Sequence, residues 1–237
     1  MQTAVLSLYR FDNRLARLWV LVQMGAARLP LMRMPGLRFW KLCGSGTGEG
    51  FTPRPNPAVW AILTVWDDAA AAERGLAARA PFGRWRDHAS EACALWLEPR
   101  STRGRWSGRA PFVAETGPAP DGPVAALTRA TLRPARALRF WGRVPDISAR
   151  IGSDPAVLFK IGLGEMPLIH QITFSVWPDT ASMAAFARTG AHAQAIRAVR
   201  DEGWFSEELY ARFRVIRSTG TWGGRNPLAP AATPRAA

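Results

Sequence analysis

The sequence predicts an α+β fold in which two tandem ferredoxin-like repeats, each with the order β-α-β-β-α-β, pack as an intramolecular dimeric α/β barrel. Three observations predict it. Segments with strand alternation and segments with helical spacing follow one another in this order twice. Short sequence matches recur between the two halves, as an internal duplication produces. A four-stranded sheet with helices on one face also needs cover on the other, which a second copy supplies.

The first repeat is expected over residues 1–107. Asp12 or Asn13 caps its first helix, which Pro30 ends and in which one apolar face is formed by Leu15, Leu18, Trp19 and Val22. The segment 44–57 is rich in glycine and proline and is expected to be a loop. Strands are expected at residues 4–9, 37–43, 58–66 and 92–97, and further helices at residues 69–79 and 85–91.

The second repeat is expected over residues 124–223. A linker rich in Gly, Pro and Ala, residues 108–123, separates it from the first, and residues 224–237 are expected to be a disordered tail. Strands are expected at residues 124–132, 157–161, 168–177 and 208–215, and helices at residues 134–150 and 180–200.

Local matches support the duplication. Lys41 and Lys160 are the only lysines in a chain with 31 basic residues, and the alignment places them at equivalent positions. Their placement indicates a specific role in both repeats; the alternative is a buried ion pair, for instance with Glu165 in the second repeat. The matched segments are residues 18–19 with 140–141, 39–41 with 158–160, 65–68 with 176–179, and 105–108 with 221–224.

Composition narrows the classes of protein. A hydrophobic fraction of 48% with 11 Trp predicts a packed core, and the net charge of +13 favours anionic partners. Two cysteines without a CxxC motif indicate a reduced, cytoplasmic compartment. The N-terminus lacks a secretory pattern, and no apolar run reaches 18 residues, so the chain is expected to lie on a membrane at most, not to cross it.

The three histidines show no zinc spacing and no HExxH motif. His192 shares a helical face with Ala195, Ile196 and Val199, so it is either a core histidine or a haem ligand in an apolar pocket. His170 lies in a strand of undecided register, and His88, among charged neighbours, is expected to be solvated.

Other motifs in the sequence indicate a function less specifically. The glycines at 44–48 lead into prolines and not into a helix, which argues against a phosphate loop. Cys43 and Cys93 are expected to be packed apolar residues, and no Ser-His-Asp order is present. Trp and Arg interleave over residues 84–109, which fits either single-stranded nucleic acid binding or a sheet core with a basic rim.

Several segments resemble the spheroidene monooxygenase family, the acyclic carotenoid 2-ketolases of photosynthetic bacteria. The resemblance covers nearly the whole chain to Trp222 and is most specific in the run Gly-Trp-Phe-Ser-Glu-Glu at residues 203–208. The other similar segments are residues 160–165, 171–177, 183–188 with His192, 195–197, 39–42, 61–66 and 106–108.

This resemblance implies an iron-dependent haem b monooxygenase of carotenoid biosynthesis. It would use O₂ and reduced ferredoxin to place a keto group at C-2 of spheroidene-type carotenoids through two successive hydroxylations. His192 becomes the leading axial ligand, with Cys43 and His170 as rivals. Contacts to the cofactor are expected from Arg188, Arg197 and Lys160, and a substrate tunnel from Trp60, Phe174, Trp177 and Phe186.

The carotenoid must leave the membrane, so peripheral association with the photosynthetic inner membrane is expected, with residues 29–35 as a candidate contact. A buried helix–strand connection explains the same segment equally well. Two other classes of function remain: a non-catalytic barrel that binds a lipid-like ligand, and a basic nucleic-acid-binding protein.

Overall fold

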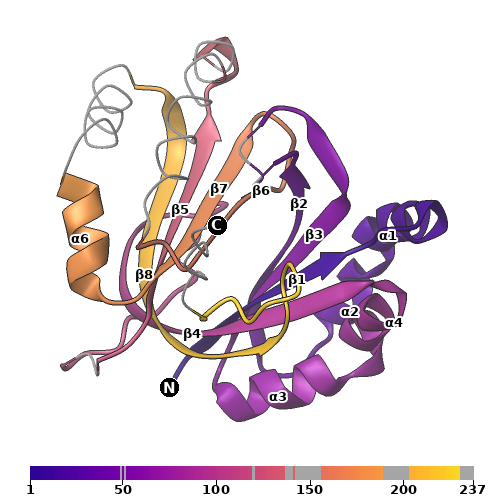
Figure 1. Cartoon of the computed structure of the whole chain (residues 1–237), viewed down its shortest axis with the longest axis horizontal. Coiled ribbons are helices and arrows are strands. Elements are labelled where there is room, and N and C mark those ends of the chain that lie inside the picture. Colours follow the sequence, from indigo (N-terminus) through magenta and orange to yellow (C-terminus); the bar gives the residue numbers. More distant parts are fainter. Residues whose placement is uncertain are drawn as a thin grey trace, which may run out of the picture.

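Eight antiparallel strands close into one barrel in the order β1-β3-β2-β6-β7-β5-β8-β4 (Figure 1). The structure, a computed structural model, describes residues 1–48, 50, 52–118, 121–136, 141, 156–188 and 203–229, with the backbone alone at 187–188. The strands are β1 (Thr3–Arg10), β2 (Leu37–Gly46), β3 (Pro55–Trp66), β4 (Glu91–Gly104), β5 (Val124–Leu132), β6 (Phe159–Gly164), β7 (His170–Trp177) and β8 (Phe205–Gly220).

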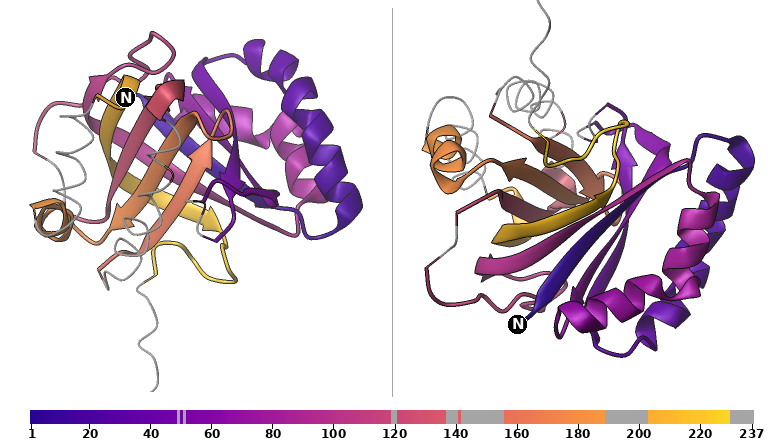
Figure 2. Two further views of the ribbon diagram at one scale, coloured as in Figure 1. Left: turned by 90° about the horizontal axis from the view of Figure 1, so that it is seen from above. Right: turned by 60° about the horizontal axis from the view of Figure 1, so that its bottom comes forward.

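The helices lie outside the barrel on opposite sides (Figures 1 and 2). Those of the first repeat cover one side and α6 lies on the other, so the predicted tandem-repeat barrel is confirmed. The helices are α1 (Arg14–Ala26), α2 (Arg28–Met32), α3 (Ala69–Ala77), the π-type turn η1 (Arg79–Gly83), α4 (Arg84–His88) and α6 (Thr180–Arg188).

Side-chain oxygens fix where three of these helices begin. Asn13 Oδ1 accepts a hydrogen bond from the Ala16 N–H at 2.7 Å, and Asp68 caps α3 through the Ala71 N–H at the same distance. Asp179 caps α6 through the Ser182 N–H, also at 2.7 Å. Each cap satisfies an N–H that the helix itself leaves without an acceptor, and Asn13 was among the residues predicted to do so.

Alternation along the strands gives the barrel a single inner core. Inward side chains from both repeats pack together into one cluster. The inner core includes Leu6, Leu8, Phe39, Cys43, Leu63, Leu95, Leu127, Phe159, Phe174 and Phe213.

A second core lies between the outer face of the first repeat's strands and its helices. It is built from large side chains, including Tyr9, Phe11, Leu42, Ile62, Trp66, Phe82 and Trp85. From α1 it takes only Ala16 and Val20 as fully buried residues. Of the apolar stripe that the sequence predicts on this helix, Leu15, Leu18 and Val22 face solvent, whereas Trp19 is partly buried against the second core.

Two seams of unequal length join the repeats. β4 pairs with β8 from Cys93↔Gly220 to Gly104↔Leu209, whereas β2 and β6 pair only at Gly44↔Gly164 and Ser45↔Leu163. The second seam is short because both strands end there in glycine-containing turns. The barrel is consequently tight along one seam and open beside the other.

The tryptophan turns confirm the duplication. Trp106 bridges to Arg109, and Trp222 makes the same bridge to Arg225. Glu207 accepts hydrogen bonds from the N–H groups of the first turn, Ser107 and Gly108, and the corresponding Glu91 accepts one from Gly224 in the second. Each repeat thus supplies a carboxylate that fixes the turn of the other.

The alignment of the two lysines is wrong by one residue. Val65 pairs with Phe39 in the first repeat and its counterpart Val176 pairs with Phe159 in the second, so Lys41 corresponds to Ile161. Since neighbouring strand residues point to opposite faces, Lys41 faces the barrel interior and Lys160 the outside. The two lysines therefore have different surroundings.

The predicted linker and tail both contact the barrel. Phe112 is buried in the inner core and packs edge-on against Phe213, with ring centroids 5.0 Å apart. In the tail, the Arg225 carbonyl accepts a hydrogen bond from the backbone N–H of Trp222 at 2.8 Å, and Leu228 packs against the inner core. The boundaries at 107, 123 and 223 remain predictions, because both repeats contribute to one core.

Within the described residues, no helix combines the length and the apolar character that crossing a bilayer requires.

The buried carboxylate of Glu98 gives a stability prediction. It is 2% exposed and accepts hydrogen bonds from Arg214 at 2.7 Å and Arg100 at 2.9 Å. Burial alone raises the pKa of Glu98, but the two arginines outweigh it and the pKa lies below its ordinary value. We expect Glu98→Gln to lower the free energy of unfolding at pH 7 by about 3 kcal/mol, because two cations lose their partner.

The effect depends on pH. Because the folded pKa is depressed, the stabilisation is complete above the unfolded pKa of about 4.3 and is lost as the pH falls through the folded value. Urea unfolding should therefore show a smaller difference in the free energy of unfolding between wild type and Glu98→Gln in acid than at pH 7. The control is Glu73→Gln, whose exposed pair with Arg217 at 2.7 Å is worth less than about 1 kcal/mol. Equal effects of the two substitutions would contradict the prediction.

Candidate functional site

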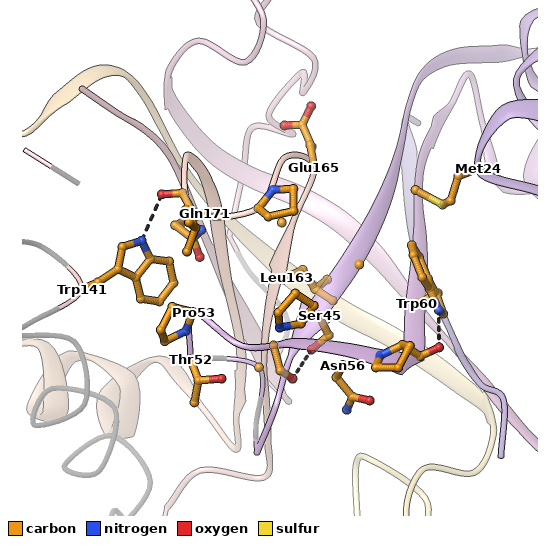
Figure 3. Close-up of a pocket in the computed structure, with 18 of the residues that line it drawn as sticks. Met24, Ser45, Thr52, Pro53, Asn56, Trp60, Trp141, Leu163, Glu165 and Gln171 are labelled. Carbon is orange, nitrogen blue, oxygen red and sulfur yellow. Dashed lines mark hydrogen bonds between the residues drawn. The ribbon is translucent and has the colours of Figure 1, made fainter. Parts of the chain in front are cut away.

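An apolar pocket of about 390 Å³ opens beside the short seam (Figure 3). Trp60 and Trp141 stand on opposite sides of it, with Ser45 and Leu163 between them. The remaining lining residues come from α1, from the ends of β2, β3, β6 and β7, and from the β2–β3 and β6–β7 connections: Leu21, Met24, Gly44, Gly46, Gly50, Thr52, Pro53, Pro55, Asn56, Pro57, Gly164, Glu165, Pro167, Leu168 and Gln171.

Most polar groups around this pocket are engaged elsewhere. The indole N–H of Trp60 donates to the Pro57 carbonyl at 2.8 Å, and that of Trp141 donates to the Leu168 carbonyl at 3.1 Å. Ser45 Oγ donates to the Gly162 carbonyl at 2.9 Å. The two tryptophans consequently present their apolar rings, and the pocket suits an apolar ligand.

A close backbone approach shapes one wall. Gly50 has φ of +92°, and a Cβ at this position would lie 2.0 Å from the Gly162 carbonyl oxygen. Only glycine satisfies both conditions, so the β2–β3 connection lies against β6 at this point. The loop predicted over 44–57 is too long, since β2 extends to Gly46 and β3 begins at Pro55. The glycine-rich stretch thus builds the wall of an apolar pocket, and a phosphate loop is not what it forms.

At four outward positions the second repeat carries smaller side chains than the first repeat. The pairing of strands matches each outward residue with its counterpart in the first repeat, where the helices pack on bulky groups. In order of first and second repeat, the corresponding residues are Val5 and Ala126, Tyr9 and Ala130, Leu42 and Gly162, and Ile62 and Thr173.

This small-residue face, defined by Ala126, Ala130, Gly162 and Thr173, continues into the pocket. Gly162 pairs with Thr173, and the next outward pair along the same strands is Gly164 with Gln171. Both residues of that second pair line the pocket. An apolar ligand in the pocket would therefore lie next to the small-residue face of β6 and β7.

A charged cluster closes one end of the barrel. Lys41 Nζ donates to Glu165 Oε2 at 2.7 Å, and the indole N–H of the buried Trp106 donates to Glu165 Oε1 at 2.5 Å. Arg129, only 1% exposed, forms ion pairs with both Glu165 and Glu207. The glutamate predicted to pair with a lysine thus pairs with Lys41 of the other repeat.

Burial and this cluster together shift the pKa of two groups, Glu207 and His170. Burial raises the pKa of Glu207, but hydrogen bonds from Gly108 and Ser107 and the charge of Arg129 hold it below its ordinary value. Burial lowers the pKa of His170, with Arg129 and Lys41 acting in the same direction and Glu165 opposing them. The imidazole of His170 is thereby favoured in its neutral form at neutral pH.

The predicted cofactor ligands divide between described and undescribed parts of the chain. His192 and Arg197 lie outside the described residues, and Arg188 is the last residue of α6, where only the backbone is described. Lys160 lies on the outer side of β6, two residues from Gly162, and lines a neighbouring pocket with Arg10.

The two rival ligands lie on the inner side of the barrel. Cys43 is fully buried in the inner core, where burial raises the pKa of its thiol, so a thiolate is disfavoured. His170 belongs to the inward set of β7 and is half-buried near the charged cluster. Neither side chain is on the small-residue face.

In the described part of the chain, the predicted tunnel residues lie in three different places. Trp60 lines the pocket, whereas Phe174 is fully buried in the inner core. Trp177 and Phe186 contact each other, with ring centroids 4.9 Å apart, between β7 and α6. His88, expected to be solvated, is exposed and stacks on Trp19 at 3.9 Å.

Sequence reasoning missed the small-residue face and the partners of Glu165. The first was visible in principle, since aligning the repeats with the correct register sets Leu42 against Gly162. The second joins Lys41 and Trp106 of one repeat to Arg129 and Glu165 of the other, which no local pattern indicates. In the part of the chain that the structure describes, no cluster of three or more His, Cys, Asp and Glu residues suits a metal ion.

The fold defines the class to which this protein belongs, the dimeric α+β barrel. The solved structure of an aldoxime dehydratase superposes with a TM-score of 0.65 at 11% identity, over 98% of this chain and 89% of that one. No protein-family model matches the chain.

The sequence comparisons are more specific. Spheroidene monooxygenase of Rhodobacter capsulatus is 53% identical over 232 residues, which cover 97% of this chain and 96% of the relative. That of Cereibacter sphaeroides is 50% identical over 237 residues, which cover 99% of this chain and 73% of the relative. The chain belongs to the spheroidene monooxygenase family.

The two thiols give a prediction that bears on the rival ligand. Burial raises the pKa of Cys93 to about 12 and that of Cys43 further still. We expect neither thiol to react with a chromogenic disulfide reagent in the folded protein at pH 8, and both to react in denaturant, because the thiolate is the nucleophile. Stoichiometric modification of Cys43 in the folded protein, assigned with Cys93→Ala, would contradict its placement in the core.

Proposed function

We propose that the protein is a carotenoid monooxygenase that introduces a keto group at C-2 of spheroidene-type acyclic carotenoids. The observation that carries this proposal is the apolar pocket that opens onto the small-residue face, in a member of this family. A polyene has no charged group to bind, so its recognition rests on apolar surface such as Trp60 and Trp141 provide.

Haem b is the cofactor that we propose for the small-residue face. Replacing Tyr9, Leu42 and Ile62 of the first repeat by Ala130, Gly162 and Thr173 removes bulk over the sheet, which fits a flat cofactor placed between sheet and helix. When bound, haem supplies the activation of O₂. His192, in the segment of the sequence that follows α6, is the residue that would bind the haem iron.

Cationic side chains are the proposed partners of the haem propionates. Lys160 borders the small-residue face, and Arg188 ends α6 on the same side of the barrel. Together with Arg197 they provide the positive charge that two carboxylates require.

The chain's own residues position the substrate and exclude water. The walls around Trp60, Trp141 and Leu163 hold the polyene, and the charged cluster fixes the turn that carries Pro167 and Leu168 against it. Two successive hydroxylations at the same carbon give a gem-diol, which loses water to leave the ketone. Reduced ferredoxin is the proposed electron donor, and a net charge of +13 favours docking of a small acidic protein.

Two measurements test this function. We expect purified protein to show, or to acquire on titration with haem, a Soret band that His192→Ala weakens. We also expect turnover of spheroidene to its 2-keto product with reduced ferredoxin and O₂. Carotenoid binding with neither a Soret band nor turnover would identify a haem-free binding protein and overturn the proposal.

The small-residue face can be tested directly. Gly162→Leu restores the side chain that Leu42 provides in the first repeat, and we expect it to weaken haem binding by at least about tenfold, because the isobutyl group occupies the cofactor's space. The matched control, Gly162→Ala, adds one methyl group and should retain most of the binding. Haem titration followed at the Soret band, with circular dichroism to verify folding, measures both. Unchanged affinity in a folded Gly162→Leu protein would place the cofactor elsewhere.

A further inference from the structure

The outward face of α1 and α2 is apolar, although it faces solvent. Side chains at helical spacing on this face are half or more exposed, whereas a helix at a protein surface ordinarily turns its polar side to water. Their exposed fractions are 79% for Leu15, 61% for Leu18, 50% for Leu21, 68% for Val22, 50% for Leu29 and 65% for Met32. We call this set the α1–α2 apolar face.

The charged residues within this helical segment all have the same sign. Between Asn13 and Gly36 the sequence contains no Asp or Glu, and its four charged residues are Arg14, Arg17, Arg28 and Arg33. Arg14, Arg28 and Arg33 are exposed. An apolar helical stripe bordered by arginines has the composition of a helix that lies in the interface of an anionic bilayer.

The apolar pocket opens next to this face. Leu21 belongs to the α1–α2 apolar face and also lines the pocket, where Met24 of the same helix joins it. Across the opening, Leu168 lines the pocket and is 43% exposed, and its neighbour Met166 is 49% exposed. Leu21 therefore connects the α1–α2 apolar face with the pocket.

We propose that the α1–α2 apolar face docks on the surface of an anionic lipid bilayer and that the pocket receives its ligand directly from the bilayer. The docking step stands on the exposed side chains and the arginines alone. The transfer of a carotenoid rests on the proposed function.

Charge complementarity selects a bilayer over a second copy of the chain. A symmetric dimer through this face would bring the arginines of two copies together with no carboxylate in the segment to compensate them. Anionic headgroups neutralise the same arginines, while the acyl region accepts Leu18 and Val22. The predicted contact at residues 29–35 covers the end of this surface, except that Leu31 is buried.

Flotation with vesicles tests the docking. We expect the full chain to float with vesicles of phosphatidylcholine and phosphatidylglycerol, more weakly with phosphatidylcholine alone. Leu18→Glu with Val22→Glu should reduce binding at least about tenfold, because the charged side chains resist insertion. Neither residue lines the pocket. The control is Ile216→Glu, at a position that is 42% exposed on β8, and it should bind as wild type does.

Three outcomes would overturn the docking proposal: no binding of wild type to anionic vesicles, equal binding of the double variant, or equal loss in the control. Arg14→Gln with Arg33→Gln gives a second variant, expected to lose the preference for anionic vesicles while keeping residual binding. Sedimentation of wild type and double variant tests the remaining explanation, in which the face is an interface between two copies of the chain. A wild-type dimer that the substitutions dissociate, without vesicle binding, would assign the face to a second copy.

Activity measurements separate this inference from the proposed function. With carotenoid in detergent micelles, the double variant should turn over substrate as wild type does. With carotenoid embedded in vesicles, it should be slower by about tenfold, in line with its loss of binding. Absence of turnover by wild type in both media would overturn the proposed function and leave the vesicle-binding result standing. Equal rates of variant and wild type on vesicle-borne substrate would overturn delivery from the bilayer.

Discussion

The closure of two repeats into one barrel is the constraint on which the rest of the structure depends. Each strand has one inward face, and the inward faces of both repeats share a single packed core. The seams that close it are unequal, long between β4 and β8 and only two residue pairs between β2 and β6. The pocket lies where the short seam ends, since strands that stop pairing at Gly44 and Gly164 leave the connections beyond them to form its walls.

Because the inner face is committed to the shared core, the outer faces are free to diverge. The first repeat fills its outer face with Tyr9, Leu42 and Ile62 and becomes a rigid support for its helices. The second repeat keeps the same backbone pairing and carries Ala130, Gly162 and Thr173 instead. The smaller side chains of the second repeat leave the shared inner core unchanged, since they lie on the outer face of its strands.

How far the sequence predicts this structure depends on the range of the interactions involved. Local patterns suffice for the order of elements, the caps at Asn13, Asp68 and Asp179, and the barrel that follows from two repeats. Strand register is not a local property. The sequence alignment matched Phe39 with Leu158, whereas the structure matches it with Phe159. This error of one residue placed Lys160 on the wrong face of its strand, because neighbouring residues point to opposite faces. Periodicity finds the apolar stripe of α1 but cannot tell a protein core from a lipid surface, since both favour leucine and valine. The Lys41–Glu165 pair joins residues 124 positions apart and had no sequence signal.

The charged cluster connects these features. Glu165 follows β6 directly, and its bonds to Lys41 and Trp106 tie the β6–β7 turn to the first repeat at the edge of the pocket. The same turn carries Met166 and Leu168 outward, on the side where α1 presents Leu21. A buried ionic network adds little net stability compared with apolar packing, but it fixes geometry, because each partner left alone is costly. The position of the charged cluster is consistent with this role in fixing geometry. The cluster holds the β6–β7 turn on one side of the apolar opening, and α1, which faces outward, forms the other side.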